Sequence, residues 1–336
     1  MRTIVISRPP APLNHPQFSA ARRYPVLMQE PARFWARAAE RVDSPTGPVH
    51  LAQWGHSPTS EDAARAHARE RLARLAERVR IHGLPRRQDE GQGGSLSAGG
   101  AALRTDEGSY YDAQPAREEV LQELRDSADA LLAVITRNRY GSLILTTDTI
   151  AFVDIDLPPA PPAKQPLFGR GAWRQKQEEH RAERKRRVDL IASWALRHPV
   201  CSVITYETAA GLRVAISGLD AAADSAQMQQ VMQDLEADPL YARLCARHAT
   251  YRARLTAKPW RCGVTALSDT SDYPTTSAAE QSAREEWISG YDAARAGTRA
   301  VQRLDTSGPA VSGAAAVVLD LHDRLSGAAD GASRLA

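Results

Sequence analysis

The stretch from Ile150 to Leu157, IAFVDIDL, decides the fold of this chain. It is rich in residues that favour β-structure, and it ends at two prolines that cannot continue a sheet. Successive side chains of a strand point to opposite faces. The pattern therefore predicts a strand that presents Asp154 and Asp156 on one face and buries the apolar residues between them on the other.

The segments around this strand predict more strands and two helices. Residues 117–137 have an amphipathic helix pattern, and 142–147 are rich in strand formers. A long charged helix is expected at 173–198, followed by a hairpin of strands 200–206 and 212–217. The order helix, strand, strand, helix, strand, strand predicts an α+β fold in which helices back a small central sheet.

The whole chain divides by composition into five parts. We expect an N-terminal strand and helical segment (1–83), a Gly/Ser-rich flexible linker (84–115), the α/β core (116–220), a mainly helical part (221–327) and a disordered tail (328–336). Within these parts the expected elements are a strand at 3–7, helices at 31–42, 60–81, 224–256 and 278–304, a polar loop at 263–277, and a strand or short helix at 314–321.

The overall composition excludes several classes of protein. The 336 residues are 43% hydrophobic and 25% charged, as in globular proteins, and the net charge of +3 is compatible with a nucleic-acid partner. No run approaches ~18 apolar residues and no secretory signal is apparent, so a cytoplasmic protein without a membrane partner is expected. No Rossmann, Walker or hydrolase motif occurs, and three scattered cysteines form no disulfide framework or zinc motif.

Asp154 and Asp156 form the first candidate site. Two adjacent carboxylates repel each other unless a cation compensates them, and Mg²⁺ or Mn²⁺ is the usual partner of clustered carboxylate oxygens. Such ions bridge nucleotide phosphates and an attacking hydroxyl, and a metal-dependent nuclease would use the same carboxylates. The alternative interpretation is a solvated face of an edge strand.

The hairpin reading YETAAGLRV is the second candidate site. A tight turn from Thr208 to Gly211 would let backbone N–H groups approach a phosphate, and Arg213 would add a bidentate contact. The alternative is a turn that only needs its glycine.

Residues 243–261 form the third candidate site, with six basic residues, no acid and two interleaved aromatics. Basic side chains neutralise phosphates and aromatic rings stack on bases, so the stretch predicts binding of nucleic acid along a helix. The candidates are Arg243, Arg247, Tyr251, Arg252, Arg254, Lys258, Trp260 and Arg261. A solvated arginine-rich face is the alternative, as it is for the charged helix residues 174–187.

The order of these motifs resembles the catalytic core of the archaeo-eukaryotic primase superfamily, which includes the primase-polymerases. FVDIDLP fits the family's acid-x-acid strand and YETAAGLRVAIS its nucleotide-binding hairpin, although Arg213 and Val214 stand where the family has a histidine. Asp320, in VVLDLHD, is similar to the family's third acid. The resemblance covers about residues 117–220 and implies an RRM-like central sheet and a role in DNA replication.

The expected function is therefore the handling of DNA or RNA and nucleoside triphosphates. In an active form, Asp154, Asp156 and Asp320 would be catalytic, with Mg²⁺ or Mn²⁺ as cofactor for nucleotidyl transfer. A non-catalytic nucleic-acid-binding protein on the same scaffold, favoured by the missing histidine, is the first alternative. A protein-interaction factor without nucleic acid is the second. The sequence does not indicate an oligomeric state.

Overall fold

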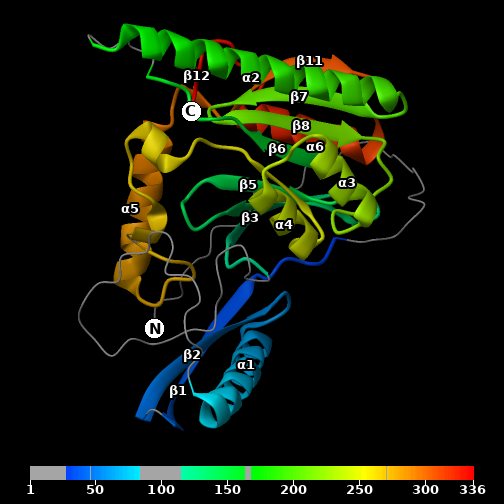
Figure 1. Cartoon of the computed structure of the whole chain (residues 1–336). Coiled ribbons are helices and arrows are strands. Elements are labelled where there is room, and N and C mark those ends of the chain that lie inside the picture. The colour runs from blue at the N-terminus through cyan, green and yellow to red at the C-terminus, as the bar shows by residue number, and fades with distance from the viewer. Residues whose placement is uncertain (1–27, 46, 84–114, 163–167, 270) are drawn as a thin grey trace. The chain divides into compact units, whose positions relative to one another are not determined.

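The computed structural model describes residues 28–45, 47–83, 115–162, 168–269 and 271–336 (Figure 1). The described residues form two compact units, one within Glu30–Ala116 and one of Met28, Gln29 and the described part of Arg117–Ala336. The described residues hold six α-helices and several antiparallel sheets, so the expected α+β class is confirmed. None of the described helices has the length and apolar character needed to cross a membrane.

The smaller unit is a hairpin packed on one helix. Strands β1 (Phe34–Ser44) and β2 (Gly47–Ser57) pair antiparallel, and α1 (Glu61–His82) buries its apolar residues against them. A side chain at Gly55 of β2 would collide with α1, since its Cβ would lie 2.1 Å from the backbone nitrogen of Ala68. The helix expected at 60–81 is confirmed.

The helix expected at 31–42 is wrong, because this segment forms β1. Its alanines and arginines favour a helix in isolation, but pairing with β2 and burial of Val42 against α1 override that local preference.

The larger unit contains two four-stranded antiparallel sheets. The first has the order β3-β4-β5-β9 and the second the order β11-β7-β8-β6. Their strands are β3 (Glu119–Arg125), β4 (Leu131–Arg137), β5 (Leu143–Thr147), β6 (Ala151–Asp156), β7 (Ser202–Thr208), β8 (Gly211–Ser217), β9 (Tyr251–Arg254) and β11 (Val301–Ser307). A single hydrophobic cluster draws on both sheets, so they share one core.

Five helices accompany these sheets. They are α2 (Arg170–Arg197), α3 (Ala226–Asp234), α4 (Pro239–His248), α5 (Ala278–Ala294) and α6 (Gly313–Ser326). Helices α2 and α6 lie on opposite faces of the β11-β7-β8-β6 sheet, since α2 pairs with Glu207 and α6 contacts the neighbouring residue Tyr206 (Figure 1). Strand β8 lies between β6 and β7, so β6, α2, β7 and β8 form a split βαβ unit.

Most of the predicted central elements are present. The strands expected at 142–147, 150–157, 200–206 and 212–217 correspond to β5 to β8, and the helix at 173–198 corresponds to α2. The helix expected at 117–137 is wrong, because this segment forms the β3–β4 hairpin. Its turn is fixed by Asp126, whose carboxylate accepts hydrogen bonds from the N–H groups of Ala128 and Ala130, and by Asp129 in a left-handed conformation (φ 62°).

The division at residue 220 is also wrong, because β9 and β11 each complete one of the two sheets. Helix α5 ends at Ala294, and the segment expected to continue it forms β10 (Thr298–Arg299) and the start of β11. The tail is ordered, with β12 (Arg334–Leu335) paired parallel to β10 and Ala336 buried. Residues 314–321 are helical, as part of α6. The strand expected at 3–7 and nearly all of the linker at 84–115 lie outside the described residues.

Candidate functional site

The acid pair lies at the end of strand β6, on the sheet face that α6 covers. Asp154 stands directly opposite Arg213 of β8 in the strand register. The Arg213 guanidinium donates from Nε to Asp154 Oδ1 at 2.7 Å and from Nη2 to Oδ2 at 3.1 Å. Both carboxylate oxygens of Asp154 therefore accept from one planar guanidinium, the strong bidentate form of an ion pair.

Arg213 is held inside the protein and does not face solvent. Its side chain is only 4% exposed, and its Nη1 donates a third hydrogen bond, at 2.8 Å, to the backbone carbonyl of Arg254. Burial lowers the pKa of Arg213, but the Asp154 carboxylate more than offsets this effect, so the pKa is raised above its ordinary value. The prediction that Arg213 contacts phosphate is therefore wrong for this structure, because every nitrogen of its guanidinium already serves an internal partner.

Asp156 lies two residues further along β6 and is exposed. Its pKa is raised by partial burial, then by the carboxylates of Asp238 and Asp154, while Lys258 and Arg254 act in the opposite direction. Asp238 was not predicted as a site residue. It begins α4, where its carboxylate accepts from the N–H of Leu240 at 3.0 Å and its own N–H donates to the Asp154 carbonyl at 2.9 Å. The Asp-Pro pair at 238–239 signals a helix start, but not its position beside β6.

Three cations gather beside Asp156. The pKa of Lys258 falls to about 8, first because the side chain is partly buried and then because Arg254 and Arg261 repel its charge. Burial also lowers the pKa of Arg261, and the Asp156 carboxylate opposes that change. These shifts show that the three cations and the acid interact electrostatically. An added anion at this point would relieve the mutual repulsion of the cations.

An exposed indole completes this group. Trp260 is 50% exposed and lies in the short helix η1 (Pro259–Cys262). Its ring meets that of Tyr140 edge-to-face at 5.5 Å, and the Lys258 ammonium lies 5.4 Å from the ring centroid. We call Arg254, Lys258, Trp260 and Arg261 the basic surface.

The helix expected to reach residue 256 is wrong beyond His248. Helix α4 ends at His248, Ala249 takes a left-handed conformation (φ 50°), and the chain then forms β9, which pairs with β5. Arg243 and Arg247 therefore lie on exposed positions of α4, before the strand β9 that ends at Arg254. Neither is among the groups that shift the pKa of Lys258 or Asp156.

Two predicted nucleic-acid contacts are structural residues. Tyr251 is 1% exposed and donates its hydroxyl hydrogen bond to the Ala221 carbonyl, so it offers no stacking surface. Arg252 is largely buried and donates to both oxygens of Glu118, at 2.6 and 2.8 Å. Both residues lie on β9, where one face packs into the core and the other is used for this ion pair.

The turn between β7 and β8 does not need a phosphate to explain its sequence. A Cβ at Gly211 would lie 2.0 Å from the Ile155 carbonyl oxygen, so glycine is required for the close approach of β6. Thr208 uses its hydroxyl oxygen to accept from the N–H of Ala210 at 3.3 Å. The alternative interpretation, a turn that needs its glycine, accounts for the hairpin.

Asp320 does not join the acid pair. It lies on α6 instead of a strand, its side chain is 73% exposed, and its nearest recorded partner is Arg324 at 3.5 Å. Across the described residues, no group of three or more His, Cys, Asp or Glu side chains is arranged to hold a metal ion. Because both oxygens of Asp154 are already occupied by Arg213, the donor set at the acid pair does not fit Mg²⁺ or Mn²⁺.

A partly buried polar cluster lies on the same sheet face and was not predicted. Tyr206, the register neighbour of Arg213, donates its hydroxyl hydrogen bond to Asp323 of α6 at 2.6 Å. The same carboxylate lies 2.9 Å from Nδ1 of His322, which is fully buried, and 3.5 Å from Arg303. No short sequence motif marks this cluster, because its members come from three distant segments.

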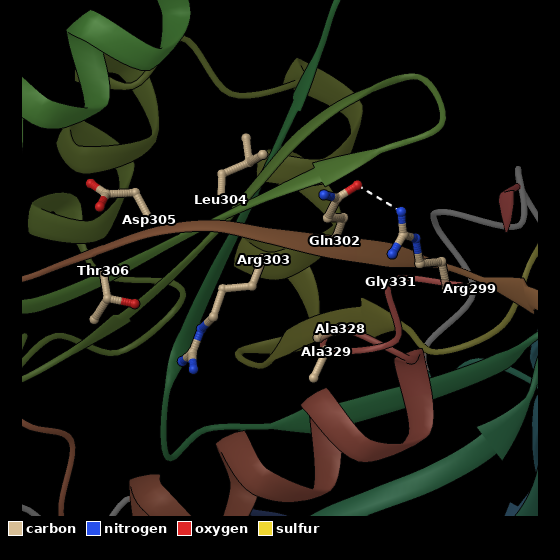
Figure 2. Close-up of a pocket in the computed structure, with 9 residues that line it drawn as sticks. All are labelled: Arg299, Gln302, Arg303, Leu304, Asp305, Thr306, Ala328, Ala329 and Gly331. Carbon is tan, nitrogen blue, oxygen red and sulfur yellow. Dashed lines mark hydrogen bonds between the residues drawn. The ribbon is translucent and has the colours of Figure 1, made fainter. Parts of the chain in front are cut away.

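A separate hollow of about 460 Å³ runs along β11. Figure 2 shows Arg299 turned toward Gln302, with a hydrogen bond of 2.7 Å, while Arg303 extends away from that pair. None of the predicted site residues lines this hollow.

No protein-family model, curated protein or solved structure matches this chain. The resemblance to the primase superfamily therefore rests on the sequence motifs alone.

Proposed function

We propose that this protein binds single-stranded nucleic acid through the basic surface, on a primase-polymerase-like core that acts without catalysis. The observation that carries this proposal is the Lys258 ammonium, which lies 5.4 Å from the centroid of the half-exposed Trp260 ring, with Arg254 and Arg261 close enough to repel its charge. Closely spaced cations bind successive phosphates, and an exposed aromatic ring stacks on a base regardless of its identity.

The position of the basic surface is a second support for a core like that of the primase superfamily. It adjoins the acid pair on β6, and β6 belongs to the split βαβ unit with the hairpin that carries Arg213. An RRM-like sheet uses such a unit as its scaffold for nucleic acid. The chain would then present phosphate contacts where an active relative handles its nucleotide.

The Arg213–Asp154 pair favours binding without catalysis. Metal-dependent nucleotidyl transfer, and a nuclease of the same type, need carboxylate oxygens that are open to a divalent cation. Both carboxylate oxygens of Asp154 accept hydrogen bonds from the buried Arg213 guanidinium. Asp154→Ala and Asp156→Ala are therefore expected to leave nucleic-acid binding in place.

The proposal is tested with a short fluorescent oligodeoxythymidylate, and with oligouridylate to compare DNA with RNA, by fluorescence anisotropy at low salt. The double variant Lys258→Gln/Arg261→Gln should lower the affinity by about tenfold or more. Arg174→Gln/Lys176→Gln removes the same two types of charge from exposed positions on α2 and should have little effect. If both variants bind as the wild type does, the basic surface is not the site.

The competing functions predict other outcomes in this experiment. A protein-interaction factor would show no oligonucleotide binding at any salt concentration. Nucleotidyl transfer would appear as primer extension with Mn²⁺ and nucleoside triphosphates that Asp156→Ala removes. Its support is the surroundings of Asp156, whose pKa is raised first by partial burial and then by the carboxylates of Asp238 and Asp154.

A further inference from the structure

We propose that Arg213 is a built-in substitute for a divalent metal ion at the acid pair, and that it keeps this site closed to Mg²⁺ and Mn²⁺. The inference rests on the proposed function, because it explains how nucleic acid can bind beside two carboxylates without a metal. The evidence for this inference is the geometry of the Arg213 guanidinium.

The guanidinium fills the position that a cation would need. Its Nε and Nη2 donate to the two oxygens of Asp154 at 2.7 and 3.1 Å. The guanidinium fork has the spacing that a carboxylate needs for two such hydrogen bonds. A metal ion at Asp154 would require at least one of the same oxygen atoms. The two occupants therefore exclude each other.

Arg213 is also fixed from several directions. Its backbone position opposite Asp154 is set by the β6–β8 register, and its Nη1 is held at 2.8 Å by the carbonyl of Arg254 on β9. A side chain that is 4% exposed and bonded to two different strands cannot swing into solvent without breaking the core. Any metal that approached Asp156 would also meet this fixed positive charge.

The acids near Asp154 determine what kind of site would form if the Arg213 guanidinium were removed. The pKa of Asp156 is raised first by partial burial and then by repulsion from the carboxylates of Asp238 and Asp154. Without Arg213, the neighbouring carboxylates of Asp154 and Asp156 would share one face of β6 with no cation opposite Asp154 in the strand register. Clustered carboxylates of this kind bind hard divalent cations.

The experiment measures Mn²⁺ binding by the electron paramagnetic resonance signal of free Mn²⁺. The wild type should bind no Mn²⁺ through Asp154, so wild type and Asp154→Asn should give equal signals. Arg213→Gln should bind about one Mn²⁺ per chain and gain thermal stability when Mn²⁺ is added. The double variant Arg213→Gln/Asp154→Asn should lose that binding, and Arg213→Lys, which keeps a cation, should not acquire it.

Two results would overturn the inference. One is Mn²⁺ binding by the wild type that Asp154→Asn removes, a comparison that stands even if Arg213→Gln fails to fold. The other is a folded Arg213→Gln variant, checked by circular dichroism, that binds no Mn²⁺. Oligonucleotide binding measured on the same samples in EDTA keeps the two proposals apart. Loss of oligonucleotide binding alone would remove the proposed function and leave the metal substitution in place.

Discussion

Among single residues, Arg213 and Lys258 are two cations removed from solvent to different degrees, and their surroundings shift their pKa values in opposite directions. Arg213 has a carboxylate and a carbonyl as fixed partners, and its pKa is raised. Lys258 lies between two arginines and its pKa is lowered to about 8. The first is a structural charge and the second is a charge suited to an incoming anion.

The lowered pKa of Lys258 predicts a pH-dependent affinity. The lysine is charged below its pKa and neutral above it, so oligonucleotide affinity should fall as the pH rises through about 8. Lys258→Arg should remove this dependence, since arginine stays charged over the same range. Anisotropy titrations at a series of pH values measure the effect. Parallel pH profiles for wild type and Lys258→Arg would show that Lys258 does not contact the ligand.

Trp260 should contribute to binding and not to stability. Replacing this half-exposed ring by alanine is expected to cost about 1–3 kcal/mol of binding free energy, the usual value for one stacked base, while Trp260→Phe keeps most of it. Tyr251→Phe is the matched control. It removes a buried hydroxyl hydrogen bond, so it should lower the free energy of unfolding by about 1 kcal/mol and leave oligonucleotide binding unchanged. Unchanged binding by Trp260→Ala, or weaker binding by Tyr251→Phe, would show that Trp260 is not the stacking residue.

For individual residues, the sequence predicts the acid pair and the basic residues but not the groups that they contact. Alternation along β6 is enough to place Asp154 and Asp156 on one face. That Arg213 neutralises Asp154 follows only from the register between β6 and β8, which no local pattern encodes.

Among the elements, the β7–β8 hairpin shows how backbone packing fixes a residue type. Gly211 is required because the Ile155 carbonyl oxygen would lie 2.0 Å from any Cβ at this position. Gly211→Ala should lower the free energy of unfolding by about 1–3 kcal/mol through overpacking, as measured by urea denaturation. Gly290→Ala is the control within α5, where a Cβ has no neighbour within 4 Å, and it should stabilise by about 0.5–1 kcal/mol. Equal effects of the two substitutions would contradict the packing argument.

The elements that sequence patterns misassign share a physical cause. Residues 117–137 have apolar residues at helical spacing, but all seven residues of β4 (Leu131–Arg137) are buried, so this strand shows no alternation that would reveal it. Residues 31–42 and 251–254 become strands only because β2 and β5 pair with them. Elements with strong local signals, such as α1 and α2, were predictable, and elements defined by distant partners were not.

For the whole molecule, long-range pairing determines which residues form the site. Strand β11 pairs with β7 across about a hundred residues of sequence, and β9 brings Arg254 to the guanidinium of Arg213. The predicted division at residue 220 fails for this reason, and so does the assignment of Asp320, which depends on the packing of α6.

The salt dependence of binding tests how much of the molecule takes part. If Arg254, Lys258 and Arg261 contact three phosphates, the logarithm of the binding constant should fall with the logarithm of salt concentration with a slope of about −2. If Arg243 and Arg247 on α4 bind as well, the slope should be about −3.5, and Arg243→Gln/Arg247→Gln should reduce it. A slope near zero would mean that binding does not depend on phosphate contacts.

Binding of nucleic acid by the basic surface without a metal is tested by comparing oligonucleotide binding in EDTA with binding in Mn²⁺. Fluorescence anisotropy would be measured for the wild type and for Lys258→Gln/Arg261→Gln under both conditions. The wild type should bind with equal affinity with and without the metal, and the variant should bind more weakly under both conditions. Wild-type binding that appears only with Mn²⁺, and that Asp154→Asn abolishes, would contradict binding without a metal and identify the acid pair as a metal site.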